Sequence, residues 1–233
     1  MAGIFVLAGG DEFRKGYEEP DQKLLFLLSV GLGPIVIVPT AAAHEGPERA
    51  VINGLRHFRA LTPTIPVEGA LVVDANTANE PGLVGQIRAA GLVYLTGGDP
   101  WHLVQSLRGS ATVEALKHVL ERGGMVAGSS AGAMALCQWL RGRGSGWQEG
   151  LGLVPGVAVI PHHGDAPGNL QALRGTLPAE AVVLGIPTGV NCVGQQSKDA
   201  TPPAQWRVFG ARPVTVYRAS GVTQVREGQG FTL

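Results

Sequence analysis

The sequence predicts an α/β fold with a doubly wound, mostly parallel sheet and helices on both faces. Short runs of β-branched and aliphatic residues recur along the chain, and most of them are apolar at every position, which is typical of central strands covered on both sides. Segments of helical length, with apolar residues at the helical repeat, separate the early runs. Strands that alternate with helices form right-handed βαβ units, and such units build a parallel sheet.

Nine apolar runs are the expected strands, and five amphipathic segments between the early runs are the expected helices. The strands are Gly3–Ala8, Pro34–Val38, Ala70–Val73, Leu92–Leu95, Met125–Ala127, Val157–Ile160, Val182–Ile186, Val190–Val193 and Val214–Tyr217. The helices are Gln22–Val30, Pro47–Leu61, Pro81–Ala90, Pro100–Leu107 and Ala111–Arg122. After about residue 150 the helical pattern fades, so the C-terminal third is expected to add strands and hairpins at the edge of the sheet.

Capping residues mark the ends of several elements. Asp99 directly precedes Pro100, a combination typical of an N-cap followed by proline at the first helical position. Ser110 is placed to cap the next helix, and Gly123–Gly124 suits a left-handed exit from it. The strand that follows leads directly into Gly128–Gly132, and a helix-forming run comes next.

Length and composition favour one domain that acts on small molecules or peptides. The 233 residues suit a single core, so we expect one domain over 1–233. The 18 basic and 18 acidic residues balance, without a basic run, which argues against nucleic acid or an anionic membrane as a partner. The sequence shows neither a stretch apolar enough to span a bilayer nor a secretion signal. A cytoplasmic location is therefore expected, and a homodimer is a candidate assembly.

The two cysteines, Cys137 and Cys192, lie within apolar sequence and far from any pairing motif. They are interpreted as small core residues rather than as a disulfide, a redox pair or metal ligands. We expect no cofactor and no metal.

The segment Gly128-Ser129-Ser130-Ala131-Gly132 fits the Gly-x-Ser-x-Gly pattern of a nucleophile elbow. Flanking glycines remove the Cβ atoms that would clash in such a tight strand-to-helix turn. The middle residue, Ser130, is the predicted nucleophile. The N–H of Ala131, in the first turn of the helix, would face the oxyanion of a tetrahedral intermediate. The alternative is a flexible turn whose small residues only allow close packing.

A serine nucleophile needs a base, usually histidine. Of the six histidines, His162 and His163 stand together where a strand ends in a glycine-rich loop, and one of the two is the expected base. The alternatives are a structural pair or a metal site, for which Asp165 alone gives little support. His102 is placed to line the site. The other three, His44, His57 and His118, are expected to be structural.

The motifs LAGGDEF, VIVPTAA, VYLTGGDPWHLVQSL, GSSAGAM, GLGLVPGVAVIPHH and VLGIPTG, in this order, cover most of the chain. Together they resemble the peptidase E and cyanophycinase group of serine peptidases, whose fold is similar to that of class I glutamine amidotransferases. The resemblance implies Ser130 as nucleophile and His162, directly after Pro161, as base. It also implies that the N–H of Gly98 joins that of Ala131 in the oxyanion hole. His163 stands where the family often has phenylalanine.

The third triad member departs from the family pattern. The family's acid downstream of the serine has no clear match, and Glu149 is the nearest carboxylate, with Asp165 as a second candidate. Late in the chain, Thr188 replaces a glutamate of the family motif. Loss of an orienting carboxylate lowers turnover by up to about 10⁴-fold, so weak activity is expected. Cyanophycin is disfavoured as substrate, because the arginines that follow the histidine in cyanophycinases are missing.

The leading hypothesis is a serine peptidase or amidase that hydrolyses a peptide or isopeptide bond in a small peptide. Asp99, Trp101, His102 and His163 are the candidate lining of its substrate pocket, although Asp99 equally suits a helix cap. The main alternative is a catalytically weak or silent member that binds a small ligand or partner in the same cleft. Amidotransfer is disfavoured, because that chemistry needs a cysteine at the elbow.

Overall fold

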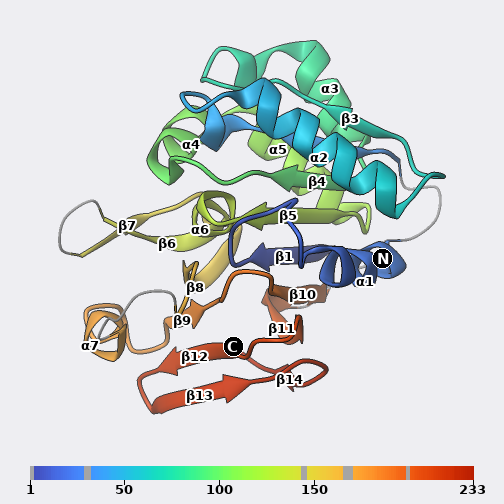
Figure 1. Ribbon diagram of the computed structural model, residues 1–233. Coiled ribbons are helices and arrows are strands. Elements are labelled where there is room, and N and C mark those ends of the chain that lie inside the picture. Colours follow the sequence, from blue (N-terminus) through green and yellow to red (C-terminus); the bar gives the residue numbers. More distant parts are fainter. Residues whose placement is uncertain (1–2, 29–32, 143–145, 165–169, 198–199) are drawn as a thin grey trace.

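The computed structural model describes residues 3–28, 33–142, 146–164, 170–197 and 200–233 (Figure 1). Its larger sheet has eight strands in the order β14-β11-β10-β1-β5-β4-β2-β3. The strands of this sheet, in chain order, are β1 (Ile4–Ala8), β2 (Ile35–Val38), β3 (Val67–Gly69), β4 (Leu92–Leu95), β5 (Met125–Ser129), β10 (Asn191–Ser197), β11 (Ala200–Phe209) and β14 (Gly230–Phe231). β1 to β5 are parallel to one another, and β10, β11 and β14 extend the sheet from β1 in antiparallel fashion. The predicted mostly parallel sheet is confirmed.

Helices cover both faces of this sheet. They are α1 (Glu18–Leu27), α2 (Pro47–Leu61), α3 (Pro81–Ala89), α4 (Pro100–Leu107), α5 (Ala111–Glu121) and α6 (Ala131–Leu136), with 3-10 turns at Thr40–Ala42 and Thr77–Asn79. The short helix α7 (Leu170–Arg174) packs instead against a strand of the second sheet, described below. Alternate strand residues point to opposite faces. In β1, Ile4 and Val6 therefore pack in the core under α1 and α2, on the viewer's side of Figure 1, whereas Phe5 and Leu7 pack in the core under α3, α4 and α5.

The extra strands expected in the C-terminal third are present, but most of them form a second sheet. This sheet has six strands in the order β13-β12-β9-β8-β6-β7. They are β6 (Cys137–Arg141), β7 (Trp147–Glu149), β8 (Val154–Ile160), β9 (Val182–Gly185), β12 (Val214–Arg218) and β13 (Gly221–Val225). Figure 1 shows them in yellow to red beside the main sheet. The end of β8 brings the residue pair His162–His163 toward the carboxyl ends of the main strands.

Several element boundaries differ from the sequence prediction. The helix expected at Gln22–Val30 lies earlier in the chain, at Glu18–Leu27. The strand expected at Ala70–Val73 lies at β3 instead, because the pairing with β2 ends where the N–H of Ala70 donates to the Ile37 carbonyl. Helix α6 is also shorter than its apolar run suggests. The carbonyls of Ala135 and Cys137, which would continue the helix, accept from the N–H groups of Leu151 and Gly152. The chain therefore leaves the helix at Cys137 and enters the second sheet.

Glu80 caps helix α3, and this cap gives a pH-dependent stability prediction. Its carboxylate accepts hydrogen bonds from the N–H groups of Gly82 (2.9 Å) and Leu83 (2.8 Å), and these bonds lower the pKa of Glu80. A lowered folded-state pKa stabilises the fold above the ordinary pKa, and the benefit is lost as the pH falls through the lowered value. We expect Glu80→Ala to lower the unfolding temperature at pH 7 and to differ clearly less from wild type at about pH 3. Thermal unfolding by circular dichroism at both pH values checks this, and an equal difference at both would contradict it.

Candidate active site

Ser130 lies on a strained turn between β5 and α6. Its φ of 47° and ψ of −108° are unusual for a residue with a side chain. The N–H of Ser130 donates to the Ala8 carbonyl at 3.1 Å, which ties the turn to β1. A Cβ on Gly128 would lie 2.4 Å from the backbone of Gly132, and a Cβ on Gly132 would lie 2.4 Å from the Leu95 carbonyl oxygen. The two glycines are therefore required for this turn on steric grounds.

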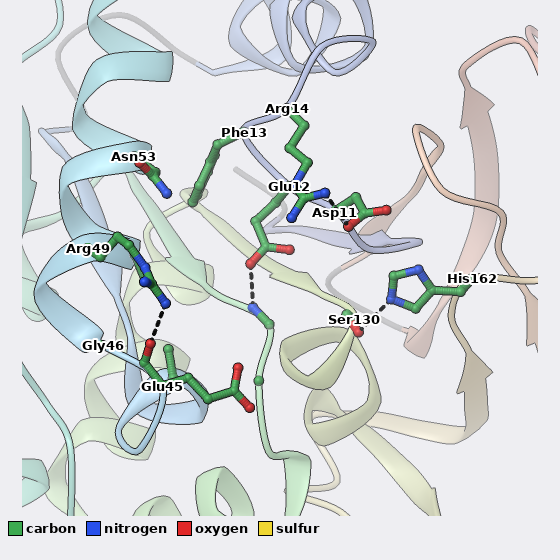
Figure 2. A pocket seen from close by; sticks show the side chains of 14 residues that line it. Asp11, Glu12, Phe13, Arg14, Glu45, Gly46, Arg49, Asn53, Ser130 and His162 are labelled. Atoms are coloured by element: carbon green, nitrogen blue, oxygen red, sulfur yellow. Dashed lines mark hydrogen bonds and ion pairs between the residues drawn. The ribbon is translucent and has the colours of Figure 1, made fainter.

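The structure brings His162 to Ser130. Nε2 of His162 lies 3.2 Å from Oγ of Ser130, within hydrogen-bond distance. His162 adopts a φ of 52°, and its N–H donates to the Gly9 carbonyl at 2.7 Å. The loop after β8 is thus tied to the loop after β1, which holds the imidazole over the turn (Figure 2).

The other ring nitrogen of His162 contacts a hydroxyl. Nδ1 lies 3.1 Å from Oγ1 of Thr188, the residue that stands in place of the family's glutamate. When Nδ1–H donates to Thr188, Nε2 is left as the acceptor for the Ser130 proton, which is the tautomer a general base needs. The hydroxyl can fix this tautomer, but it carries no charge to stabilise an imidazolium.

The structure places Glu149, one of the two candidate orienting acids, elsewhere. Glu149 lies on β7, where its carboxylate pairs with Arg108 at 3.6 Å, and it lines a separate depression together with Trp101. The position facing Nδ1 is filled by Thr188 instead, because β9 ends beside His162. Asp165, the second candidate, lies outside the described residues.

Two backbone N–H groups beside Ser130 suit an oxyanion. Gly98 has a φ of +135°, and a Cβ there would lie 2.2 Å from the Ala41 carbonyl oxygen. The neighbouring N–H groups already donate hydrogen bonds. The N–H of Gly97 donates to the Glu12 carboxylate at 2.6 Å, and that of Asp99 donates to the Ala41 carbonyl at 2.8 Å. Within the described residues, the N–H of Gly98 has no such acceptor. The N–H of Ala131 lies in the first turn of α6, where the helix itself provides no acceptor.

A pocket of about 270 Å³ opens beside Ser130 and His162 (Figure 2). Its walls come from the loop after β1, the start of α2 and the turn after β4. The lining residues are Asp11, Glu12, Phe13, Arg14, Ala42, Glu45, Gly46, Arg49, Ala50, Asn53, Gly97, Gly98, Ser130 and His162. Arg14 pairs with Asp11 at 3.6 Å, and Arg49 donates to the Glu45 carbonyl at 2.6 Å. Charged groups therefore surround the nucleophile.

The four residues predicted to line the pocket lie elsewhere. Asp99 is the N-cap of α4, and its carboxylate accepts from the N–H groups of Trp101 and His102. Trp101 lines the depression at Glu149. The ring of His102 contacts the Val73 carbonyl through Nε2 at 2.7 Å, and that of His163 contacts the Tyr217 hydroxyl at 2.9 Å. Helix and sheet contacts thus turn these side chains away from Ser130.

The polar wall formed by Asp11, Glu12, Glu45, Arg49 and Asn53 was not predicted from the sequence. The available signal was the position of the motif LAGGDEF at the end of the first strand, because ligands of open α/β sheets bind at the carboxyl ends of the strands. The motif contributed only to the family resemblance. The α2 residues follow no recognisable pattern, apart from the one-turn spacing of Arg49 and Asn53.

The two cysteines belong to the core. Cys137 and Cys192 are buried and unpaired, and burial raises the pKa of both thiols, as expected of structural cysteines.

Within the described residues, no group of three or more His, Cys, Asp or Glu side chains is arranged to hold a metal ion. None of the helices in the described ranges combines the length and apolar character that a membrane span requires.

A serine on a strand-to-helix turn of an α/β sheet, with an imidazole within hydrogen-bond distance, defines a site of the serine-hydrolase class. The model of peptidase family S51 matches residues 4–191. The chain belongs to peptidase family S51 and is a serine-type peptidase.

Solved structures agree with this assignment. The crystal structure of a peptidase from an acI-B1 Actinobacterium matches with a TM-score of 0.83 and 25% identity, over 100% of this chain and 98% of that one. A candidate peptidase E protein from Listeria monocytogenes EGD-e matches with a TM-score of 0.57 and 16% identity, over 97% of this chain and 99% of that one. The second likeness concerns the fold alone. A search of curated proteins gave no significant match.

Proposed function

We propose that this peptidase hydrolyses a peptide or isopeptide bond in small peptides, with Ser130 as nucleophile and His162 as general base. The observation that carries the proposal is the contact of 3.2 Å between Ser130 Oγ and His162 Nε2 at the edge of the pocket. Histidine within this distance is the usual means of activating a serine hydroxyl.

The reaction follows from the placement of these atoms. Ser130 Oγ attacks the substrate carbonyl carbon as Nε2 of His162 accepts its proton. The N–H groups of Gly98 and Ala131 donate to the oxygen that becomes negative. When the tetrahedral intermediate collapses, His162 returns the proton to the leaving amine. Water, activated by the same imidazole, then hydrolyses the acyl-enzyme.

Thr188 sets the expected efficiency of this reaction. Its hydroxyl orients the imidazole through Nδ1, but the charge of the imidazolium is left without a carboxylate partner there. We expect turnover below that of family members with an acid at this position. The ligand-binding alternative was based on the same substitution, and membership of a serine-type peptidase family favours hydrolysis.

The pocket supports a small, polar substrate. Its volume of about 270 Å³ lies just below the range of about 300–1,000 Å³ that is usual for small-molecule sites. The carboxylates of Asp11 and Glu45 and the guanidinium groups of Arg14 and Arg49 line it, so charged or polar substrate groups would find partners near the nucleophile. A cytoplasmic location and a homodimer stay predictions.

A library of dipeptides, short peptides and isopeptides tests the proposed function. Each member is incubated with wild type and with Ser130→Ala, and free amino acids or fragments are measured by mass spectrometry. We expect a restricted set of short peptides to be cleaved by wild type alone. Cleavage by both proteins would contradict the assignment of Ser130, and absence of cleavage of any library member by wild type would contradict the small-peptide substrate.

The Gly98 turn gives a further prediction. Alanine at this position would adopt an unfavourable φ and clash with the Ala41 carbonyl, which costs about 1–3 kcal/mol in folding stability. Because the turn must move, we expect peptide hydrolysis to fall by about 10²- to 10³-fold, the effect of losing one oxyanion donor. Gly109→Ala is the matched control, because Gly109 also has a left-handed φ but has open space around it. Equal activity of the two variants would contradict an oxyanion role for Gly98.

A further inference from the structure

The loop between β1 and α1 contacts the base His162 and the two turns that carry Gly98 and Ser130, and one of its side chains joins these two turns. We propose that Glu12 is a positioning residue that fixes the oxyanion turn at Gly97–Gly98 relative to the elbow at Ser129–Ser130. This inference rests on the proposed function, because it concerns how the same site is aligned.

The carboxylate of Glu12 bridges the ends of two neighbouring strands. Oε1 accepts from the N–H of Gly97 at 2.6 Å, and Oε2 accepts from the hydroxyl of Ser129 at 2.7 Å. Gly97 follows β4, and Ser129 is the last residue of the adjacent β5. Figure 2 shows the Glu12 side chain reaching from the loop, and the dashed line below it marks its hydrogen bond with the Gly97 N–H.

The two partners of Glu12 are the direct neighbours of the groups that would act on the substrate. Gly97 precedes Gly98, whose N–H is proposed to bind the oxyanion, and Ser129 precedes the nucleophile Ser130. Both partners are donors, and a carboxylate offers an acceptor oxygen to each in a short, charge-assisted bond. The bridge therefore fixes the distance between nucleophile and oxyanion donor, and misplacement by about 1 Å lowers rates by about 10²-fold.

The strand pairing alone would not hold this distance. The parallel register of β4 with β5 ends at Leu95 and Gly128, so the residues beyond it depend on other contacts. A Cβ on Gly97 would lie 3.1 Å from Oε1 of Glu12 and 3.4 Å from Cβ of Ser130. The turn thus packs between the carboxylate and the nucleophile, and Glu12 is a side chain that is hydrogen-bonded to both strand ends.

The same loop also supports the base. The Gly9 carbonyl accepts from the His162 N–H, and Gly10 packs against the imidazole so closely that a Cβ would lie 2.2 Å from Cε1. The Tyr17 hydroxyl donates to the Gly10 carbonyl at 2.7 Å and is buried. This bond anchors the loop at its far end. Glu12 consequently reaches the strand ends from a loop that is already fixed against His162.

Saturation kinetics of labelling by a fluorophosphonate probe test this role. The probe loses fluoride as Ser130 Oγ bonds to phosphorus, and its phosphoryl oxygen takes the place of the oxyanion. We expect Glu12→Ala to lower the maximal labelling rate by about 10²-fold with little change in the concentration for half-maximal rate. Glu12→Gln, whose amide can still accept from Gly97 while Ser129 Oγ accepts from its NH₂ group, is expected to label at nearly the wild-type rate.

Glu80→Ala is the matched control, because Glu80 also accepts two hydrogen bonds but caps α3 away from the site. It should label at the wild-type rate even where it unfolds at a lower temperature. If Glu12→Ala does not fold, Ser129→Ala removes one of the two bonds and should also slow labelling. A folded Glu12→Ala or Ser129→Ala with the wild-type rate would overturn the inference while leaving Ser130 as nucleophile. Failure of wild type to label at Ser130 would overturn the proposed function itself, and this inference with it.

Discussion

Replacement of Ser130 by alanine is expected to reduce peptide hydrolysis by at least about 10²-fold, and by less than the roughly 10⁶-fold that a complete triad loses with its nucleophile, because the wild type lacks the orienting acid. The reason is geometric, because Ser130 Oγ is the atom that the His162 imidazole reaches at the pocket edge. Initial rates on the best substrate from the peptide library measure the effect, and thermal unfolding confirms that the variant is folded. A loss below about tenfold in a folded protein would contradict the nucleophile assignment.

Replacement of Thr188 by valine is expected to lower turnover by about 10³-fold. Valine has nearly the shape of threonine but lacks the hydroxyl that contacts His162 Nδ1 at 3.1 Å. Without that partner the imidazole can adopt the unproductive tautomer, and a wrong tautomer costs up to about 10⁴-fold. The measurement is kcat on the peptide substrate, with KM followed in parallel. We expect KM to change little, because Thr188 does not line the pocket.

Thr188→Asp tests the same contact in the opposite direction, because it adds a carboxylate where Thr188→Val removes the hydroxyl. A carboxylate beside Nδ1 would fix the same tautomer and stabilise the imidazolium as well, so we expect a kcat above that of wild type. Wild-type kcat in Thr188→Val would show that the Nδ1 contact has no role in orienting the base. A kcat of Thr188→Asp below that of Thr188→Val would contradict the view that the missing carboxylate limits turnover.

The core of the fold was predictable from local patterns. Strands such as Leu92–Leu95 and helices such as Pro47–Leu61 have the predicted bounds, because fully apolar runs and amphipathic helices carry their structure in the local sequence. The second sheet was not predicted. Its strand β6 follows α6 without a break, because carbonyls of α6 and β6 bond to residues more than ten positions away, and such partners leave no local signal.

The candidate site was predictable at the residues whose catalytic role also requires a special backbone conformation. Ser130 stands between two glycines that the turn demands, and His162 follows a strand end that reaches the same edge. Both residues have positive φ angles, a conformation that side chains rarely adopt and that is typical of functional sites. The pocket wall at Glu12 and Arg49 was not predictable, because loop carboxylates and helix-surface charges look alike whether or not they face a cleft.

Closeness to Gly98 in the sequence did not predict which residues line the pocket. Asp99 and His102 stand close to Gly98 in the sequence, yet the start of α4 directs the first to backbone N–H groups and the second to the Val73 carbonyl. Residues from the loop after β1 and from α2 take their place. Parallel strands bring separate loops to one edge of the sheet, so residues distant in sequence surround the nucleophile.

Site mapping of a fluorophosphonate adduct tests the central claim most directly. Wild type, Ser130→Ala and His162→Ala are incubated with the probe, digested and analysed by tandem mass spectrometry. This claim predicts a single adduct on Ser130 in wild type, none in Ser130→Ala, and greatly slowed labelling in His162→Ala. An adduct on another residue, or labelling of Ser130 at the wild-type rate without His162, would contradict it.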